Sequence, residues 1–384
     1  MVERPLRILV IGNLPPHVLG GAENQVARLV EEWLRTGSIV EVAGHRIPTG
    51  TQALGGYDVE TKRLHSSSLG GRFGRAIGYA MSLASFAIRR RNDFDVVYCR
   101  GMGDGVLTLV VLKSIVLCSW PIVACPINAR GAGDVSFLRS IPGWRFFVGL
   151  IDRHVEAINL INMDIGDDLR SIGITSPSFS CIPNGVSVCQ TIARASIASE
   201  RRLVWTGRLG QQKGLDFLLA ALAIFKQAGE RFTLDLYGDG ELRAELIAQA
   251  KQLGLESVVH FHGPVAVGQI RRGLEAADVF VLPSRYEGMS NSALEAMEAG
   301  LPVLCTRCGG IDAAVEDGAG WVCEPDVLDS LVECLGEMFR APDSELLKRG
   351  LYARSLVEQK FSIEQIAARN IALLEQVASV KEAG

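Results

Sequence analysis

The chain has 384 residues, of which 48% are hydrophobic, so it is long and apolar enough for two domains with separate cores. Its formal net charge of -4 is uneven: residues 1–195 carry 20 Lys and Arg against 16 Asp and Glu, and the remainder carries 19 against 27. The pattern does not suggest nucleic acid, because no long stripe of dense basic residues is interleaved with aromatic ones, and we expect an anionic acceptor or surface at the N-terminal half.

The nine cysteines are scattered and do not form a disulfide framework. Only Cys305 and Cys308 make a CxxC pair, and no second pair completes a zinc site. Residues 7–12 are too short for the core of a secretory signal. The apolar segment 106–125 is broken by Pro121, which predicts a buried helix followed by a strand rather than a membrane span. We therefore expect reduced thiols, no metal and a cytoplasmic protein.

The chain opens with a strand, a glycine- and proline-rich loop and a helix. Residues 6–11 are apolar except for Arg7 and predict the strand, residues 12–22 form the loop, and apolar side chains recur at helical spacing from Glu23. A doubly wound α/β sheet begins in this way, although the loop lacks the GxGxxG spacing of dinucleotide-binding proteins. Gly20 and Gly21 at the helix start would let the backbone approach a phosphate or sugar, and a tight turn that needs glycine is the alternative.

The next segments are a strand at 39–43, a Gly-, Ser- and Thr-rich surface loop at 48–71, and a helix at 72–91. In this helix Arg72, Arg75 and the three arginines 89–91 surround aromatic and aliphatic side chains. Such a helix can lie on an anionic membrane, and a core helix with a solvated basic face is the alternative. A second basic, aromatic segment spans 139–147.

Two further strands are predicted at 95–99 and 121–125, and a polar, glycine-rich loop follows each of them. Ligands of open α/β sheets lie beyond the carboxyl ends of the strands, so we expect these loops to form the floor of a binding site. The side chains that the loops offer are Arg100, Asn128, Arg130 and Asp134.

The first domain closes with a strand at 158–162, a short helix at 167–173 and the turn Cys181–Val186, after which residues 187–201 have the composition of a linker. The alternation of strand, loop and helix then resumes. Strands are predicted at 202–205, 232–237, 258–262, 278–282 and 303–305. Helices are predicted at 217–228, from 241, after 290, at 330–339 and from 345 to the end.

Loops after these strands carry side chains suited to a diphosphate. Arg208 offers a bidentate fork and Lys213 a point charge, both beside glycines at the carboxyl end of a strand, and solvated charges are the alternative. The loop that begins at Gly263 could accept a nucleobase through its backbone. His260 and His262 are interpreted as strand residues rather than ligands.

Residues 283–302 combine a polar loop with a helix whose N-cap candidates are the Ser-Asn-Ser run 290–292. Free N–H groups and the positive end of the helix dipole face the loop and suit an anionic ligand. Glu287 in the loop and Glu295 in the helix lie eight positions apart, so both carboxylates can face one site and accept hydrogen bonds from sugar hydroxyls. A solvated helix of an ordinary α/β protein is the alternative.

Together these motifs resemble the retaining glycosyltransferases of family 4, which have the GT-B fold. The family has two glutamates separated by seven residues, and Glu287 and Glu295 match that spacing. The motifs that carry the resemblance span nearly the whole chain: Gly20–Glu23, Ile182–Val186, Gly207–Leu209, Lys213-Gly214, Gly238–Gly240, Pro283-Ser284, Glu287–Met297, Gly300–Val303 and Gly309-Gly310.

The resemblance implies an α/β protein with two Rossmann-like, doubly wound domains that face a cleft. An acceptor domain would span 1–190, a nucleotide-sugar domain 191–360, and a terminal helix at 361–384 would return to the first domain. The catalytic residues that it implies are Glu287, Arg208 and Lys213. The donor-binding residues that it implies are Gly20, Gly21, Gly207, Gly238, Gly263, Gly288, Met289, Ser290 and Glu295.

By the same resemblance, a hexose moves from a nucleoside-diphosphate sugar, UDP-linked in preference to GDP-linked, to a hydroxyl of a polysaccharide or lipid-linked glycan precursor. The nucleoside diphosphate leaves as a stable anion, so cationic groups and a helix N-terminus that neutralise its charge do most of the catalytic work. We expect an oxocarbenium-like transition state with front-face attack, and no metal or other cofactor. The basic, aromatic segments of the N-terminal half predict a lipid-linked or otherwise anionic acceptor and a place against the inner membrane face.

The chain departs from the family at one point. Many members carry a histidine on loops of the first domain, near the positions of Arg100 and Asn128, and this chain has none at either. By location, the substitutes on the acceptor side are His17, Arg100, Asn128, Arg130 and Asp134. The missing histidine leaves a catalytically silent nucleotide-sugar-binding subunit as the alternative function. A dinucleotide-dependent oxidoreductase would need the glycine fingerprint that is missing here.

Overall fold

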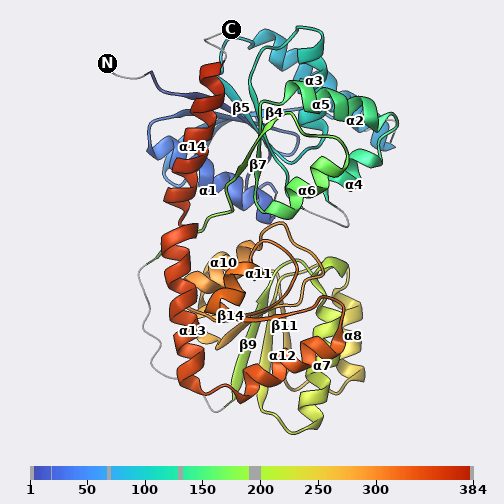
Figure 1. The fold of residues 1–384 in the computed structure, drawn as a ribbon, viewed down its shortest axis with the longest axis vertical. Helices are drawn as coiled ribbons and strands as arrows, with labels where there is room; N and C mark the ends of the chain where they lie inside the picture. Colours follow the sequence, from blue (N-terminus) through green and yellow to red (C-terminus); the bar gives the residue numbers. More distant parts are fainter. Residues whose placement is uncertain (1–3, 19, 67–70, 129–132, 190–199, 381–384) are drawn as a thin grey trace. The chain divides into compact units, whose positions relative to one another are not determined.

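The computed structural model describes residues 4–18, 20–66, 71–128, 133–189 and 200–380. The chain divides into two compact units, one made of Met1–Gly185 with Ile363–Gly384 and the other of Val186–Ser362. Each unit holds one sheet covered by helices, as the ribbon in Figure 1 shows. The linker predicted at 187–201 lies largely outside the described residues.

Unit 1 is built on an eight-stranded sheet in which all neighbours pair in parallel except the first two. Its central strands are short runs of buried aliphatic residues, which explains why the sequence predicts them. In spatial order the strands are β3 (Gly50–Leu54), β4 (Tyr57–Arg63), β2 (Ile39–Gly44), β1 (Arg7–Ile11), β5 (Val96–Arg100), β6 (Ile122–Cys125), β7 (Ala157–Leu160) and β8 (Ser178–Cys181).

The surface loop predicted at 48–71 is wrong over most of its length. Residues 50–63 form the antiparallel hairpin β3–β4, and β4 extends the sheet by pairing with β2. Its only buried side chains on β4 are Val59 and Thr61, so the alternation is too weak and too polar to stand out. Gly55 and Gly56, both at positive φ, make the two-residue turn that fixes the register.

Two helical layers cover this sheet. One contains α1 (Gly21–Arg35) and α14 (Ile363–Val380), which pack on each other, and α14 also contacts β5 and β6. The other contains α2 (Gly71–Arg89), α3 (Asp104–Ser114) and α5 (Trp144–His154), with α3 in contact with both of the others. The remaining helices are α4 (Asp134–Arg139) and α6 (Met163–Ser171). No helix within the described ranges is long and apolar enough to cross a membrane.

The return of the chain to unit 1 is fixed by buried polar contacts as well as by packing. The indole of Trp33 on α1 donates to the carbonyl of Ala367 on α14 at 3.3 Å. The amide of Asn159 on β7 donates to Asn370 of α14 at 3.2 Å, and its oxygen accepts from the backbone N–H of Ile182 at 3.1 Å. Both asparagines are 2% exposed, so if either one were replaced, water could not take its place as the hydrogen-bond partner of the other.

Unit 2 has a fully parallel six-stranded sheet. Numbered along the unit, its strands stand in the order third, second, first, fourth, fifth, sixth, which is the order of a Rossmann fold. In that spatial order they are β11 (Val259–Gly263), β10 (Phe232–Tyr237), β9 (Arg201–Thr206), β12 (Val279–Leu282), β13 (Val303–Thr306) and β14 (Gly320–Cys323). The helices are α7 (Leu215–Gln227), α8 (Arg243–Gln252), α9 (Val267–Ala276), α10 (Asn291–Glu298), α11 (Asp312–Ala314), α12 (Leu328–Arg340) and α13 (Asp343–Leu356). The sequence analysis overlooked α9.

A buried carboxylate anchors the end of α10. Glu298 is 1% exposed and forms ion pairs with Arg271 of α9 and, at 2.8 Å, with Arg354 of α13. The same carboxylate accepts the backbone N–H of Cys189 at 2.9 Å. Two cations and an N–H therefore offset the cost of taking this charge out of water, and they fix α10 against two neighbouring helices.

We predict that Asn370→Ala lowers the free energy of unfolding by about 1–3 kcal/mol, because it leaves the buried amide of Asn159 without its oxygen acceptor and only the more distant sulfur of Cys125 remains. Urea denaturation measures the change. Gln376→Ala, on an exposed position of the same helix, should cost less than about 0.5 kcal/mol. Equal effects of the two substitutions would contradict this role of Asn370.

Candidate active site

The candidate site of unit 2 lies where the strand order of its sheet reverses. Strand β9 has β10 on one side and β12 on the other, so the loops after β9 and β12 diverge at their carboxyl ends. Rossmann-like sheets bind ligands at this switch point. The loop after β9 carries Arg208 and Lys213, and the loop after β12 carries Glu287.

The structure brings Lys213 and Glu287 together although they lie 74 residues apart in sequence. The Lys213 Nζ donates to the Glu287 Oε1 at 2.6 Å, and the Ser284 hydroxyl donates to the same oxygen at 2.7 Å. The side chain of Glu287 is 7% exposed and that of Lys213 is 21% exposed. The carboxylate thus lies in a nearly dry place, where a cation and a hydroxyl both bond to it.

Backbone contacts hold the two loops against each other. The N–H of Arg285 donates to the carbonyl of Gln212 at 2.8 Å, and the side-chain amide of Gln212 donates to the carbonyl of Tyr286 at 2.8 Å. Gly214 has a φ of +63°, and a Cβ there would come within 2.0 Å of the Pro283 carbonyl oxygen. Only glycine allows this approach, so Gly214 sets how closely the turn that ends in Lys213 meets the Glu287 loop.

A second pair of side chains supports the same junction. Arg285 forms an ion pair with Asp216 of α7 at 2.8 Å and with Asp326 at 2.7 Å, and its guanidinium lies over the ring of Phe217. The sequence analysis named Ser284 only as part of a family motif, without a role, and it missed Gln212 and Arg285. Their only signal was their position beside the charged residues that we singled out.

The helix that follows Glu287 points its N-terminus into the same loop. Ser290 is the N-cap of α10, and its hydroxyl accepts the backbone N–H of Ala293 at 3.3 Å. Met289 is 7% exposed, and Glu295 lies half-buried in the helix. The N–H of Glu287 donates to the Cys308 carbonyl at 2.7 Å, so the loop after β13 supports it from the other side. The Gly288–Ser290 segment therefore stands at the positive end of a helix dipole.

Arg208 and the predicted donor glycines lie at the neighbouring strand ends. Arg208 is exposed and forms no hydrogen bond or ion pair with another residue in the described ranges. Gly238, which follows β10, has a φ of +132°, and a Cβ there would lie 1.8 Å from the carbonyl oxygen of Gly207. Backbone packing thus explains glycine at 238 without a ligand, and its contact with a donor stays a prediction.

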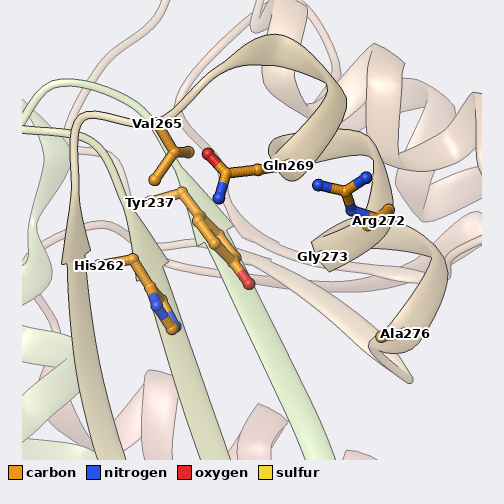
Figure 2. A pocket seen from close by; sticks show the side chains of 7 residues that line it. All are labelled: Tyr237, His262, Val265, Gln269, Arg272, Gly273 and Ala276. Atoms are coloured by element: carbon orange, nitrogen blue, oxygen red, sulfur yellow. The ribbon is translucent and has the colours of Figure 1, made fainter.

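A separate pocket of about 400 Å³ lies beside the loop that begins at Gly263 (Figure 2). His262 stacks on the ring of Tyr237 with centroids 4.5 Å apart, and its Nε2 lies 2.6 Å from Asp235. The other lining residues are Val265 and four residues of α9, among them Gln269 and Arg272. His262 is a residue of β11, as the sequence predicts, and the polar side chains of α9 were not anticipated.

In unit 1, Asp134 joins the two glycine-rich loops that the sequence predicts at one end of the sheet. One carboxylate oxygen accepts the N–H of Met102 at 2.8 Å, and the other accepts the N–H groups of Ile127 at 2.7 Å and Asn128 at 3.3 Å. Asp134 therefore shapes both loops through their backbones. Arg130 lies outside the described residues.

Arg100 is engaged within unit 1. Its guanidinium donates to Asn184 at 3.0 Å and to the sulfur of Cys125 at 3.0 Å, and its Nε is buried without a partner in the described part of the chain. These contacts tie the carboxyl end of β5 to the Pro183–Gly185 turn. This arrangement does not fit our expectation that the Arg100 side chain offers itself to a ligand.

The other N-terminal candidates lie near the start of α1. Gly20 is its N-cap, with an extended backbone, and Gly21 is its first residue. His17 is exposed, and its Nε2 lies 3.2 Å from the side-chain oxygen of Gln52 on β3. The hairpin that the sequence analysis missed thus contacts this loop.

The residues that could in principle hold a metal are otherwise occupied. Cys305 and Cys308 are buried free thiols, and burial raises the pKa of both well above the usual range. The single Asp-x-Asp sequence, Asp93–Asp95, lies before β5, where Asp95 pairs with Arg7 at 2.9 Å and Asp93 pairs with Arg90. The described residues hold no group of three or more metal-ligating side chains.

Comparisons with known proteins agree with the fold of the chain. Residues 200–340 match the family model described as "Glycosyl transferases group 1". The chain is 26% identical over 318 residues to the MMP α-(1→4)-mannosyltransferase of Mycolicibacterium hassiacum, which covers 78% of this chain and 74% of that protein. The fold of this chain is similar to that of sucrose-phosphate synthase from Thermosynechococcus elongatus, with a TM-score of 0.80 and 18% sequence identity. The match covers 98% of this chain and 100% of the synthase. Anabaena HepE in complex with UDP-glucose has a similar fold, with a TM-score of 0.73 and 19% sequence identity. The match covers 99% of this chain and 100% of HepE.

We predict that the ion pair between Lys213 and Glu287 is strongly coupled. Lys213→Met should lower the free energy of unfolding by about 3–5 kcal/mol, because it leaves a buried carboxylate without its cation. Adding Glu287→Gln should recover about 1–3 kcal/mol of that loss. Urea denaturation of the two single variants and the double variant measures the coupling.

Asp167→Asn is the matched control, since that carboxylate is 79% exposed in its ion pair with Arg170. It should cost less than about 1 kcal/mol. Strictly additive effects of Lys213→Met and Glu287→Gln would show that the two side chains do not depend on each other.

Proposed function

We propose that the chain is a group 1 glycosyltransferase of the GT-B fold, which transfers a hexose from a nucleoside-diphosphate sugar to a hydroxyl acceptor with retention of configuration. The observation that carries the proposal is the ion pair of Lys213 and Glu287 at the N-terminus of α10. A cation and a row of backbone N–H groups suit a diphosphate there, and a carboxylate suits a sugar hydroxyl.

In this proposal, Lys213 and Arg208 bind the donor diphosphate. An ammonium group has three N–H donors, so Lys213 can keep its bond to Glu287 and still donate to a phosphate oxygen. Arg208 is exposed on the same loop and offers its planar fork to a second oxygen. The N–H groups of Gly288–Ser290 and the helix dipole add positive potential where charge develops on the leaving group.

Glu287 orients the transferred sugar by accepting a hydrogen bond from one of its hydroxyls. Its position is fixed by Lys213 and Ser284, so the carboxylate is preorganised and does not need to be immobilised when the donor binds. Breaking the bond from the anomeric carbon to the phosphate oxygen leaves an oxocarbenium-like centre. The acceptor hydroxyl attacks it from the same face, and its proton goes to the departing phosphate.

The donor we propose is a UDP-hexose in preference to a GDP-hexose, with Glu295 on the ribose hydroxyls and the Gly263 loop near the base. The preference for UDP is supported by the structural relative HepE, whose complex contains UDP-glucose. The transfer of a hexose is supported by a sequence relative that is a mannosyltransferase. The acceptor we propose is a polysaccharide or lipid-linked glycan precursor.

We predict that Glu287→Ala and Lys213→Ala each raise the activation free energy by at least about 3 kcal/mol, because each removes one preorganised electrostatic contact. Turnover should therefore fall by roughly 100-fold or more. Transfer and hydrolysis of UDP-glucose, UDP-galactose and GDP-mannose are measured by nucleotide release. The controls Lys251→Ala and Glu256→Ala change exposed groups of the same unit and should leave turnover unchanged. A wild-type chain that binds a donor in calorimetry but neither transfers nor hydrolyses it would show a silent binding subunit.

We predict that turnover does not need a divalent metal ion, because Arg208, Lys213 and the N-terminus of α10 supply the positive charge that the leaving group requires. Nucleotide release should be the same in excess EDTA and in added Mg²⁺ or Mn²⁺. A loss in EDTA that either metal restores would overturn this part of the mechanism.

A further inference from the structure

Unit 1 concentrates its exposed apolar side chains on one helical layer. Ten large hydrophobic residues of the unit are exposed among the described residues, and seven of them lie on α2, α5 or the turn after α3. On α2 they are Ile77, Met81 and Ile88, which share one side of the helix, and on α5 the residue is Phe146, 64% exposed. Because α3 contacts both α2 and α5, these residues belong to one continuous layer, which Figure 1 shows on one side of unit 1.

The turn after α3 is the most exposed part of this layer. Ile115, Val116 and Leu117 are 57%, 90% and 43% exposed, so three consecutive apolar side chains face solvent. The backbone of Val116 has a φ of +61°. A β-branched residue rarely adopts this conformation, because its Cβ is crowded by the backbone.

The hydrogen bonds show that Val116 occupies a position that usually holds glycine. The N–H of Val116 donates to the Lys113 carbonyl at 3.1 Å, and the N–H of Leu117 donates to the Leu112 carbonyl at 2.9 Å. This is the Schellman arrangement at the end of a helix, with Val116 in the left-handed position. In this chain the helices α1, α6, α7, α8 and α10 place Gly37, Gly173, Gly229, Gly254 and Gly300 there.

Valine at this position is therefore unfavourable for folding for two reasons. It strains the backbone, and its side chain gains no burial, because it is 90% exposed. No contact in the described part of unit 1 explains why valine stands here. Burial of the Val116 side chain against a partner outside the chain would explain it.

The charge around the turn identifies the kind of partner. The helices α2, α3 and α5 each precede a parallel strand of the same sheet. Their C-termini therefore all lie at the edge of the sheet where those strands begin. That edge carries the exposed arginines Arg89, Arg91 and Arg153, none of which forms an ion pair with a described residue. The helix α2 contains no acidic residue at all.

The neighbouring acidic groups already have partners within unit 1. Glu156 pairs with Lys113 at 2.5 Å, and the Asp152 carboxylate accepts the N–H groups of Thr175 and Ser176. Arg90, which the sequence analysis grouped with its neighbours as a membrane contact, pairs with Glu41 and Asp93 and lies over Phe86 and Phe94. We therefore remove Arg90 from the surface and keep Arg89 and Arg91.

We propose that the outer face of α2, α3 and α5 binds an anionic lipid bilayer, with the turn Ile115–Leu117 inserted among the headgroups. Apolar side chains rimmed by arginines are the combination that such a surface attracts, and an apolar tip gains burial there that it lacks in water. The proposal depends only on the surface of unit 1. It does not depend on the reaction proposed for unit 2, which is tested separately with a donor and no lipid.

The test is sedimentation of the full chain with vesicles of phosphatidylglycerol and phosphatidylcholine, compared with vesicles of phosphatidylcholine alone. We expect binding to the anionic vesicles that weakens as salt rises. Arg89→Ser with Arg91→Ser should weaken it by about five-fold per arginine. The control pair Arg231→Ser with Lys251→Ser changes two exposed cations of unit 2 and should have no effect.

The apolar tip is tested by Val116→Asp, which should weaken vesicle binding by about ten-fold or more. Val267→Asp is the matched control, since Val267 is 81% exposed in unit 2. Val116→Gly separates fold from function: it relieves the strained backbone and should raise the melting temperature while it weakens vesicle binding.

Three outcomes would overturn the proposal. They are failure of the wild-type chain to sediment with anionic vesicles, equal binding to neutral vesicles, and equal loss in the Val116 and Val267 variants. A concentration-dependent dimer in light scattering that Val116→Asp abolishes would assign the face to a second copy of the chain instead.

Discussion

The contact on which the candidate site depends is the bond between the Lys213 ammonium and the buried carboxylate of Glu287. Neither charge would be stable at this place alone, because removing a charge from water costs several kcal/mol. Each becomes tolerable because the chain brings both to the switch point of one parallel sheet, after the first and fourth strands of the unit. The close backbone approach at Gly214 and the hydroxyl of Ser284 then set the geometry of the pair.

The same site is organised around a helix fixed at both ends. At its N-terminus, α10 is capped by Ser290 and the preceding loop is bonded to the loop after β13. At its C-terminus, Glu298 pairs with Arg271 and Arg354. A helix held in this way keeps its N–H groups aimed at one point, and preorganised dipoles of this kind contribute to catalysis without the cost of reorganising during the reaction.

Much of this could be predicted from the sequence, for a physical reason. The central strands are continuous buried runs, and ligands of parallel sheets lie at the carboxyl ends of strands, so Lys213 and Glu287 could be assigned to one site without coordinates. What failed was signalled weakly or not at all. The hairpin β3–β4 is polar and half-exposed. The partners of Arg100 and Asp134 were not predicted, because they depend on which side chains and backbone groups the fold brings beside them. The strained backbone of Val116 could not be predicted from the sequence either, because valine, unlike glycine, does not signal a left-handed residue at the end of a helix.

The most direct measurement is a crystal structure of the chain with an unreactive UDP-hexose analogue. Our account predicts the diphosphate within hydrogen-bond distance of the Lys213 ammonium and of N–H groups in Gly288–Ser290, with a sugar hydroxyl on the Glu287 carboxylate. A nucleotide bound elsewhere in unit 2, with Lys213 and Glu287 bonded only to each other, would contradict it.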